Sequence, residues 1–173
     1  MFRTLILAGV LALTPIAAVS AHDAGPTDAQ IAHIAYTAGQ LDVAAARQAL
    51  EKSTNPEIRA FAELMARDHA AVNAQAVALV TKLQVTPEAN PTSTALTEAA
   101  AATHARLEAL EGDAFDAAYV ANEVAYHQSV NAALSGTLIP EADNAELKAL
   151  LETGLALFQS HQAHAEHLAQ SVR

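Results

Sequence analysis

Four side chains that can bind a metal ion lie on the apolar faces of four helical segments of this sequence. They are Asp42, His69, His127 and His161. An ionisable group on a buried helix face is costly unless it is hydrogen-bonded, paired or bound to an ion. One such group on each of four amphipathic helices is typical of a site inside a four-helix bundle. We therefore predict that the four side chains meet in the core of an antiparallel bundle.

One carboxylate and three imidazoles are a suitable ligand set for a single divalent transition metal, with Zn, Fe, Cu and Mn all open. Glu123 lies four residues before His127 and shares its helix face, so it could be a further ligand or could hold the tautomer of the imidazole. Asp68, next to His69, could give similar support. His164 follows His161 by three residues and is the alternate ligand on that helix.

Several other kinds of site lack their motifs in this sequence. Ferritin-type di-iron sites use two Glu-x-x-His pairs, and the chain contains none. The absence of cysteine removes thiolate ligands and disulfides. A Gly-x-Ser-x-Gly elbow and a glycine-rich phosphate loop are also missing. The residues leave two interpretations open. One is a metal site with a storage, buffering or redox role. The other is a metal-free interaction or stress-response module with a buried polar network. They do not decide whether the protein is an enzyme.

The elements that must position these side chains are all predicted to be helices. A first helix begins near Thr27, whose spacing to Gln30 is that of a capping box, and a second runs from Pro56 to about Gln84. A loop over residues 86–92 leads to a short extra helix over residues 94–110. A third long helix runs from Asp113 towards Pro140, which is expected to end it, and a last one begins after a capping box at Asp143 and Glu146.

The positions of the four side chains along these helices favour a common level. Asp42 comes about a dozen residues before the first turn and His69 about as many after it. At ~1.5 Å per residue, an antiparallel pair brings them within one helical turn of each other. For His127 and His161 the match is looser, and it requires the third long helix to continue past Gly136.

The N-terminal 21 residues are typical of a secretory signal peptide, with a positive start, an apolar run and small residues up to Ala21. We expect a linker over residues 22–26 and one helical domain over residues 27–173, exported to the periplasm with no membrane span after cleavage. The net charge of the full chain is −10. Such acidity disfavours nucleic acid as a partner and is compatible with a metal ion. Protein partners cannot be predicted.

Two stretches of the sequence resemble the bacterial envelope family called domain of unknown function 4142. The first half is carried by Leu41–Val43, Ala49–Lys52, Asn55–Ala62 and Met65–His69, and the second by Leu110–Val120, His127, Glu146–Lys148 and His161. The Asp68-His69 pair and the Gly-x-x-Phe-Asp-x-x-Tyr run are the most specific parts. The resemblance implies an exported, ferritin-like four-helix bundle and no established activity. The family pattern usually has Glu at the position of Asp42.

Overall fold

The computed structural model describes residues 25–172, and all of its regular structure is helical. The all-α prediction is therefore confirmed. The predicted signal peptide (residues 1–21) and part of the linker lie outside the described residues. The helices are α1 (Asp28–Lys52), α2 (Pro56–Leu83), α3 (Pro91–Glu108), α4 (Gly112–Ala133), the π-helical segment η1 (Leu134–Leu138), α5 (Ile139–Glu141) and α6 (Ala145–Leu168).

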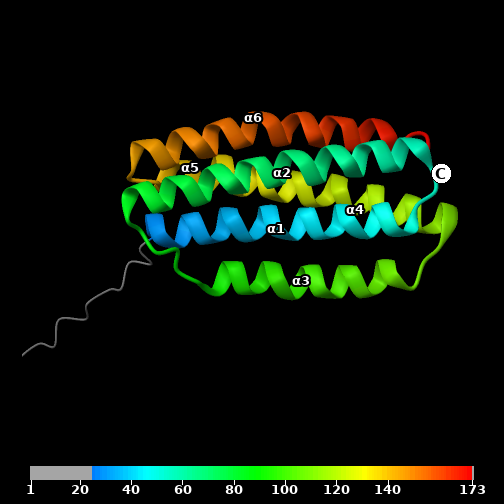
Figure 1. Ribbon diagram of the computed structural model, residues 1–173, viewed down its shortest axis with the longest axis horizontal. Helices are drawn as coiled ribbons and strands as arrows, with labels where there is room; N and C mark the ends of the chain where they lie inside the picture. Colours follow the sequence, from blue (N-terminus) through cyan, green and yellow to red (C-terminus); the bar gives the residue numbers. More distant parts are fainter. Residues whose placement is uncertain (1–24, 173) are drawn as a thin grey trace, which may run out of the picture.

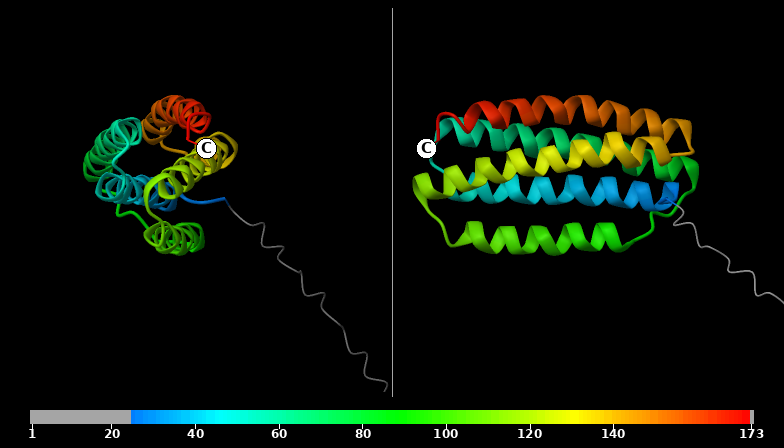
Figure 2. Two further views of the ribbon diagram at one scale, coloured as in Figure 1. Left: turned by 90° about the vertical axis from the view of Figure 1, so that its right-hand side faces the viewer. Right: turned by 180° about the vertical axis from the view of Figure 1, so that it is seen from behind.

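Four long helices, α1, α2, α4 and α6, lie side by side, and α3 lies outside them (Figure 1). The end-on view in Figure 2 shows the four around a common centre, while α3 packs mainly against α1. The chain reverses direction between α1 and α2 and again between α4 and α6, so each helix is antiparallel to the neighbour on which it packs most. This arrangement lets side chains from four helices meet at one level of the core.

Short polar side chains begin most of these helices, as the sequence indicated. Thr27 and Gln30 form the predicted capping box of α1, and Asn55 caps α2 just before Pro56. The starts of α3 and α6 correct the prediction. Asn90 caps α3, which begins at Pro91 inside the predicted loop. The cap of α6 is Asn144, whose side chain accepts from the backbone N–H groups of Glu146 and Leu147, and not Asp143.

The third long helix does not end at Pro140. It passes through η1, where the N–H of Ile139 donates to the carbonyl of Leu134, and continues to Glu141. Proline lacks an N–H and clashes with the carbonyl four residues earlier in a regular α-helix. The wider π turn changes the register immediately before Pro140, so the proline is accommodated. The helix therefore continues past Gly136, as the common level of His127 and His161 requires.

The core divides into two apolar regions along the bundle axis. One surrounds Phe61, Phe115 and Tyr119, and the other surrounds Ile31, Leu134 and Leu151. Between these regions lie buried polar side chains, including Asp42, His69, Glu123, His127 and His161. Among the helices of residues 25–172, none combines the length and apolar character needed to cross a membrane.

Candidate metal centre

Three predicted ligands from three helices converge at the middle of the core. Oδ2 of Asp42 on α1 lies 3.5 Å from Nε2 of His69 on α2 and 3.7 Å from Nε2 of His127 on α4. The two Nε2 atoms are 3.4 Å apart. The three donor atoms thus form a nearly equilateral triangle inside the protein. Each of the three residues exposes at most 2% of its surface.

His161 on α6 lies beside the other two histidines. One ring nitrogen from each of His69, His127 and His161 lies within 4.8 Å of the other two. Nε2 of His161 is 3.1 Å from Oδ2 of Asp68, and the other oxygen of Asp68 accepts from Nε of Arg67 at 2.8 Å. Nδ1 of His161 is buried and has no hydrogen-bond partner. Asp68 therefore orients His161 and not its sequence neighbour His69, and the partly exposed Asp68 connects the core to the surface.

Glu123 lies one turn before His127 on α4 and is completely buried. Its Oε2 is 3.7 Å from Nδ1 of His127. That nitrogen is also 3.0 Å from the backbone carbonyl of Glu123. Since a carbonyl oxygen can only accept a hydrogen bond, Nδ1 of His127 carries the proton. In the neutral ring the lone pair is then on Nε2, which faces Asp42 and His69. Asp42, Glu123 and His127 form a second group of potential ligands within 4.8 Å.

Burial controls the protonation of these groups. It raises the pKa of the Asp42 carboxyl from 3.8 to about 7. Burial and the neighbouring Asp42 raise the pKa of Glu123 well above its ordinary value. Burial and the charges of His127 and His161 lower the pKa of His69 to about 3, and burial lowers that of His127 to about 4. The pKa of His161 is also lowered by burial, against the opposing effect of Asp68. At neutral pH the imidazoles are therefore uncharged, as metal ligands must be.

The two buried carboxylates lack the partners that such groups normally have. All four oxygens of Asp42 and Glu123 are without a hydrogen bond within the described part of the chain. No lysine or arginine of residues 25–172 forms an ion pair with either one. A buried carboxylate without hydrogen bonds or a cation costs several kcal/mol. The arrangement can therefore bind a cation, and the donor set of imidazole nitrogens and carboxylate oxygens suits a borderline transition metal.

Two further side chains, one of them predicted as a ligand, lie outside this group of donors. His164, the alternate ligand, is exposed and presents its ring edge to Phe61, with centroids 5.0 Å apart. The hydroxyl of Tyr126 donates to the carbonyl of Ala38 at 2.7 Å and so ties α4 to α1.

Sequence reasoning also missed one neighbour of the site. The ring of Phe158 stacks on His69 with centroids 4.4 Å apart and an interplanar angle of 4°. Phe158 comes three residues before His161 on the apolar stripe of α6, and this spacing could have suggested it.

Comparison with known proteins agrees with the resemblance. The sequence profile of the family described as Domain of unknown function (DUF4142) matches residues 13–168. This chain belongs to that family. No protein with a curated description matches. The activity of this family member is not established.

Two solved structures share the fold at low sequence identity. One is a protein from Streptomyces coelicolor described as secreted and assigned to the family DUF305, with a TM-score of 0.70 and 14% identity, covering 82% of this chain and 90% of its own. The other is CopM in the Cu(II)-bound form, with a TM-score of 0.65 and 14% identity, covering 85% and 98%. At this identity the likeness is one of fold.

Proposed function

We propose that this DUF4142 protein is an exported, ferritin-like four-helix bundle that binds one divalent transition-metal ion between its helices. Asp42, His69, His127 and His161 supply the ligands, and Asp68 holds the ring of His161. Glu123 is a further ligand or neutralises the charge of the ion. Its role is the storage or buffering of the metal, or a redox reaction at the ion.

The observation that carries this proposal is the spacing of the three donor atoms of Asp42, His69 and His127. Their separations are 3.4, 3.5 and 3.7 Å. Around a tetrahedral ion with metal–ligand distances of ~2.0–2.1 Å, neighbouring donors are about 3.3–3.4 Å apart. These side chains therefore need to move only a few tenths of an ångström to hold an ion. His161, which has a ring nitrogen within 4.8 Å of those of His69 and His127, is the proposed fourth ligand.

The chemistry of the donors narrows the choice of metal. The donors are nitrogen and oxygen, which suit Zn²⁺, Cu²⁺, Fe²⁺ and Mn²⁺ better than the soft Cu⁺ ion. Affinity at such a site rises from Mn²⁺ to Cu²⁺ and falls again at Zn²⁺. The Cu(II)-bound state of CopM, which has a similar fold, supports Cu²⁺ as the first ion to test. The secreted DUF305 protein and the N-terminal sequence pattern support export.

The test is elemental analysis by plasma mass spectrometry on untagged protein purified from the periplasm. We expect about one equivalent of a single metal in the wild type and its loss in the double variant His69→Ala, His127→Ala. The matched control is the double variant His164→Ala, His167→Ala, which removes two exposed histidines of α6 and should keep the metal. Far-UV circular dichroism establishes that both variants are folded.

Metal retained in the His69, His127 variant would refute the assignment of ligands. A wild-type protein without metal, whose melting temperature does not respond to Zn²⁺, Cu²⁺, Mn²⁺ or Fe²⁺, would refute the metal site altogether. The core group would then be a polar network that specifies packing, and the function would have to be sought in protein partners.

A further inference from the structure

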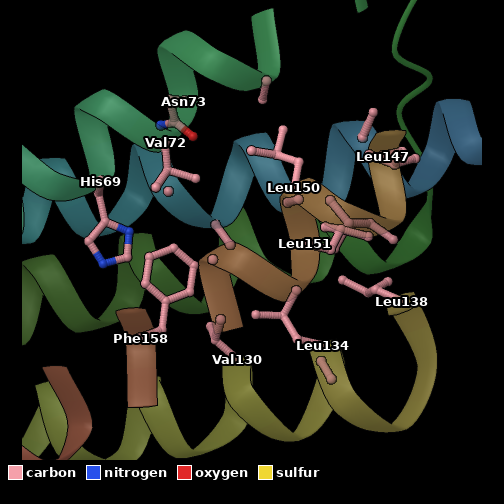
Figure 3. Close-up of a pocket in the computed structure, with 18 of the residues that line it drawn as sticks. His69, Val72, Asn73, Val130, Leu134, Leu138, Leu147, Leu150, Leu151 and Phe158 are labelled. Atoms are coloured by element: carbon pink, nitrogen blue, oxygen red, sulfur yellow. The ribbon is translucent and has the colours of Figure 1, made fainter. Parts of the chain in front are cut away.

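An apolar cavity of about 200 Å³ lies between α1, α2, α4 and α6, beside the candidate metal centre, and Thr92 and Leu96 of α3 also line it (Figure 3). His69 and Phe158 stand at one end, and the cavity extends towards Leu138 and Leu147 near the turn between α4 and α6. Small residues such as Ala38 and Gly154 line the middle and leave the space open. Exposed residues such as Ser129 and Ala133 also line it, so the cavity is partly open to solvent.

Two buried nitrogen atoms at the polar end of this cavity have no hydrogen-bond partner. They are Nδ1 of His69 and Nδ2 of Asn73. Both residues line the cavity, and they are four residues apart on the same face of α2. Only 2% of His69 and 4% of Asn73 is exposed, so bulk water does not satisfy these atoms. Leaving buried polar groups unpaired costs about 1–3 kcal/mol each.

The cavity is separate from the donor atoms of the metal centre. The stacked rings of His69 and Phe158 close its end, as Figure 3 shows. His69 thus presents Nε2 to Asp42 and His127, while its Nδ1 is left for a partner on the cavity side. A molecule in the cavity would therefore contact His69 without displacing a metal ligand.

We propose that this cavity binds a small, uncharged aliphatic molecule that carries one hydroxyl group. The hydroxyl lies between His69 and Asn73, and the aliphatic part extends towards Leu138. This function goes beyond the proposed metal site and does not require the ion.

Size, charge and hydrogen bonding select this class of ligand. An engineered protein cavity of ~150 Å³ holds benzene, so a space of about 200 Å³ fits a somewhat larger molecule of about eight carbons. An anionic head group is disfavoured because the buried carboxyl of Asp42 is near His69 and the described residues that line the cavity include no lysine or arginine. A hydroxyl both donates and accepts, so it suits His69 in either tautomer and accepts from the amide of Asn73.

The test records the ¹³C-methyl NMR signals of leucine and valine in the full mature chain as 1-octanol is added. Octanoate is the anionic comparison, and each titration is run with and without EDTA, so that the result does not depend on the metal. We expect saturable shifts at the methyl groups of Val72, Leu134 and Leu151 with 1-octanol, and much weaker binding of octanoate. Asn73→Leu, which keeps the volume and removes the amide, should weaken binding by about fivefold.

Two blocking variants test the location. A Cβ at Gly154 meets only the ring of Phe158, at 3.5 Å, so Gly154→Leu can place its side chain in the cavity. We expect it to abolish the saturable shifts, while Thr153→Leu on the exposed face of α6 leaves them unchanged. Ala76→Leu is a second blocking variant from α2 if Gly154→Leu does not fold. Wild-type protein without saturable shifts would show a cavity that holds water only, and equal binding by the blocked variants and Thr153→Leu would overturn the assignment.

Discussion

Replacing Asp42 by asparagine should have opposite effects on the stability of the metal-free and the metal-loaded protein. The amide has nearly the shape of the carboxylate but no charge, so the metal-free core loses a costly buried anion. The same change removes a charged ligand from the proposed site. A residue kept for packing would not give effects of opposite sign.

The magnitude for the metal-free protein can be worked out from the pKa of the carboxyl. Burial raises this pKa from 3.8 to about 7, so the folded state holds a proton that the unfolded state releases between these values. The stability of the wild type is therefore reduced as the pH rises from about 4 to 7, and the full loss is present above pH 7. A shift of this size corresponds to about 4 kcal/mol. For a domain of this length that equals roughly 8–16 °C in melting temperature.

The assay compares thermal melting of wild type and Asp42→Asn in EDTA between pH 4.5 and 8, and then with one equivalent of Cu²⁺ or Zn²⁺. In EDTA the variant should be the more stable protein, by a margin that grows with pH and levels off above pH 7. All other ionisable groups are present in both proteins, so the difference in stability between them isolates Asp42. With metal, the wild type should gain more stability than the variant, because an ion that binds the folded state more tightly stabilises it more.

Two results would refute this reasoning. A difference between the proteins that does not change with pH would mean that Asp42 is not a buried, strained carboxyl. Equal stabilisation of both proteins by metal would mean that Asp42 does not bind the ion.

Three further predictions concern the pH dependence of metal binding, Asp68 and Gly39. Metal affinity should fall as the pH drops below 7, because a proton then competes with the metal for Asp42. Protons should not compete for His69 and His127 above about pH 5, because the pKa values of these histidines are about 3 and 4. A chelator competition titration with a flat profile from pH 7.5 to 5.5 would contradict this. Asp68→Asn should weaken metal binding by about 10–100-fold, because the carboxylate of Asp68 orients the ring of His161. Calorimetry measures the affinity, and the control Asp113→Asn, which changes an exposed residue, should bind the metal as tightly as the wild type does. Gly39→Ala should lower the free energy of unfolding by about 1–3 kcal/mol, because the new Cβ would stand 2.8 Å from Nδ2 of Asn73. In denaturant melts, adding Asn73→Ala to this variant should restore most of the lost free energy. If the losses of the two single variants simply add in the double variant, the contact is not the cause.

Periodicity and capping residues were sufficient to predict the long helices from the sequence. The apolar stripes of α1, α2, α4 and α6 placed Asp42, His69, His127 and His161 on inward faces, and the structure brings them together. The choice between His161 and His164 could also be made from the stripe, since only His161 matches the spacing of Leu151 and Phe158.

Contacts between helices that are distant in sequence could not be predicted in this way. Asp68 lies beside His69 in the chain, but its side chain points off the inward face and reaches His161 across the α2–α6 contact. The start of α6 was misplaced because Asp143 and Asn144 are both good caps. The backbone N–H groups of both residues are bound by the side chain of Asp28 on α1, a contact that no local pattern contains. The path through Pro140 likewise depends on a π turn without a sequence signature.

That π turn has a consequence for insertions and deletions. A π segment is equivalent to an α-helix that has gained one residue, and each residue added to a helix rotates the remainder of the helix by about 100°. Upstream of it, α4 presents Glu123 and His127 to the polar centre, and at its C-terminal end Leu138 borders the apolar cavity. Deleting one of residues 134–137 would turn Leu138 away from the cavity and leave His127 in place. A deletion between Glu123 and His127 would separate that pair. The length of the π segment therefore sets the position of Leu138 at the cavity without moving His127 at the polar centre.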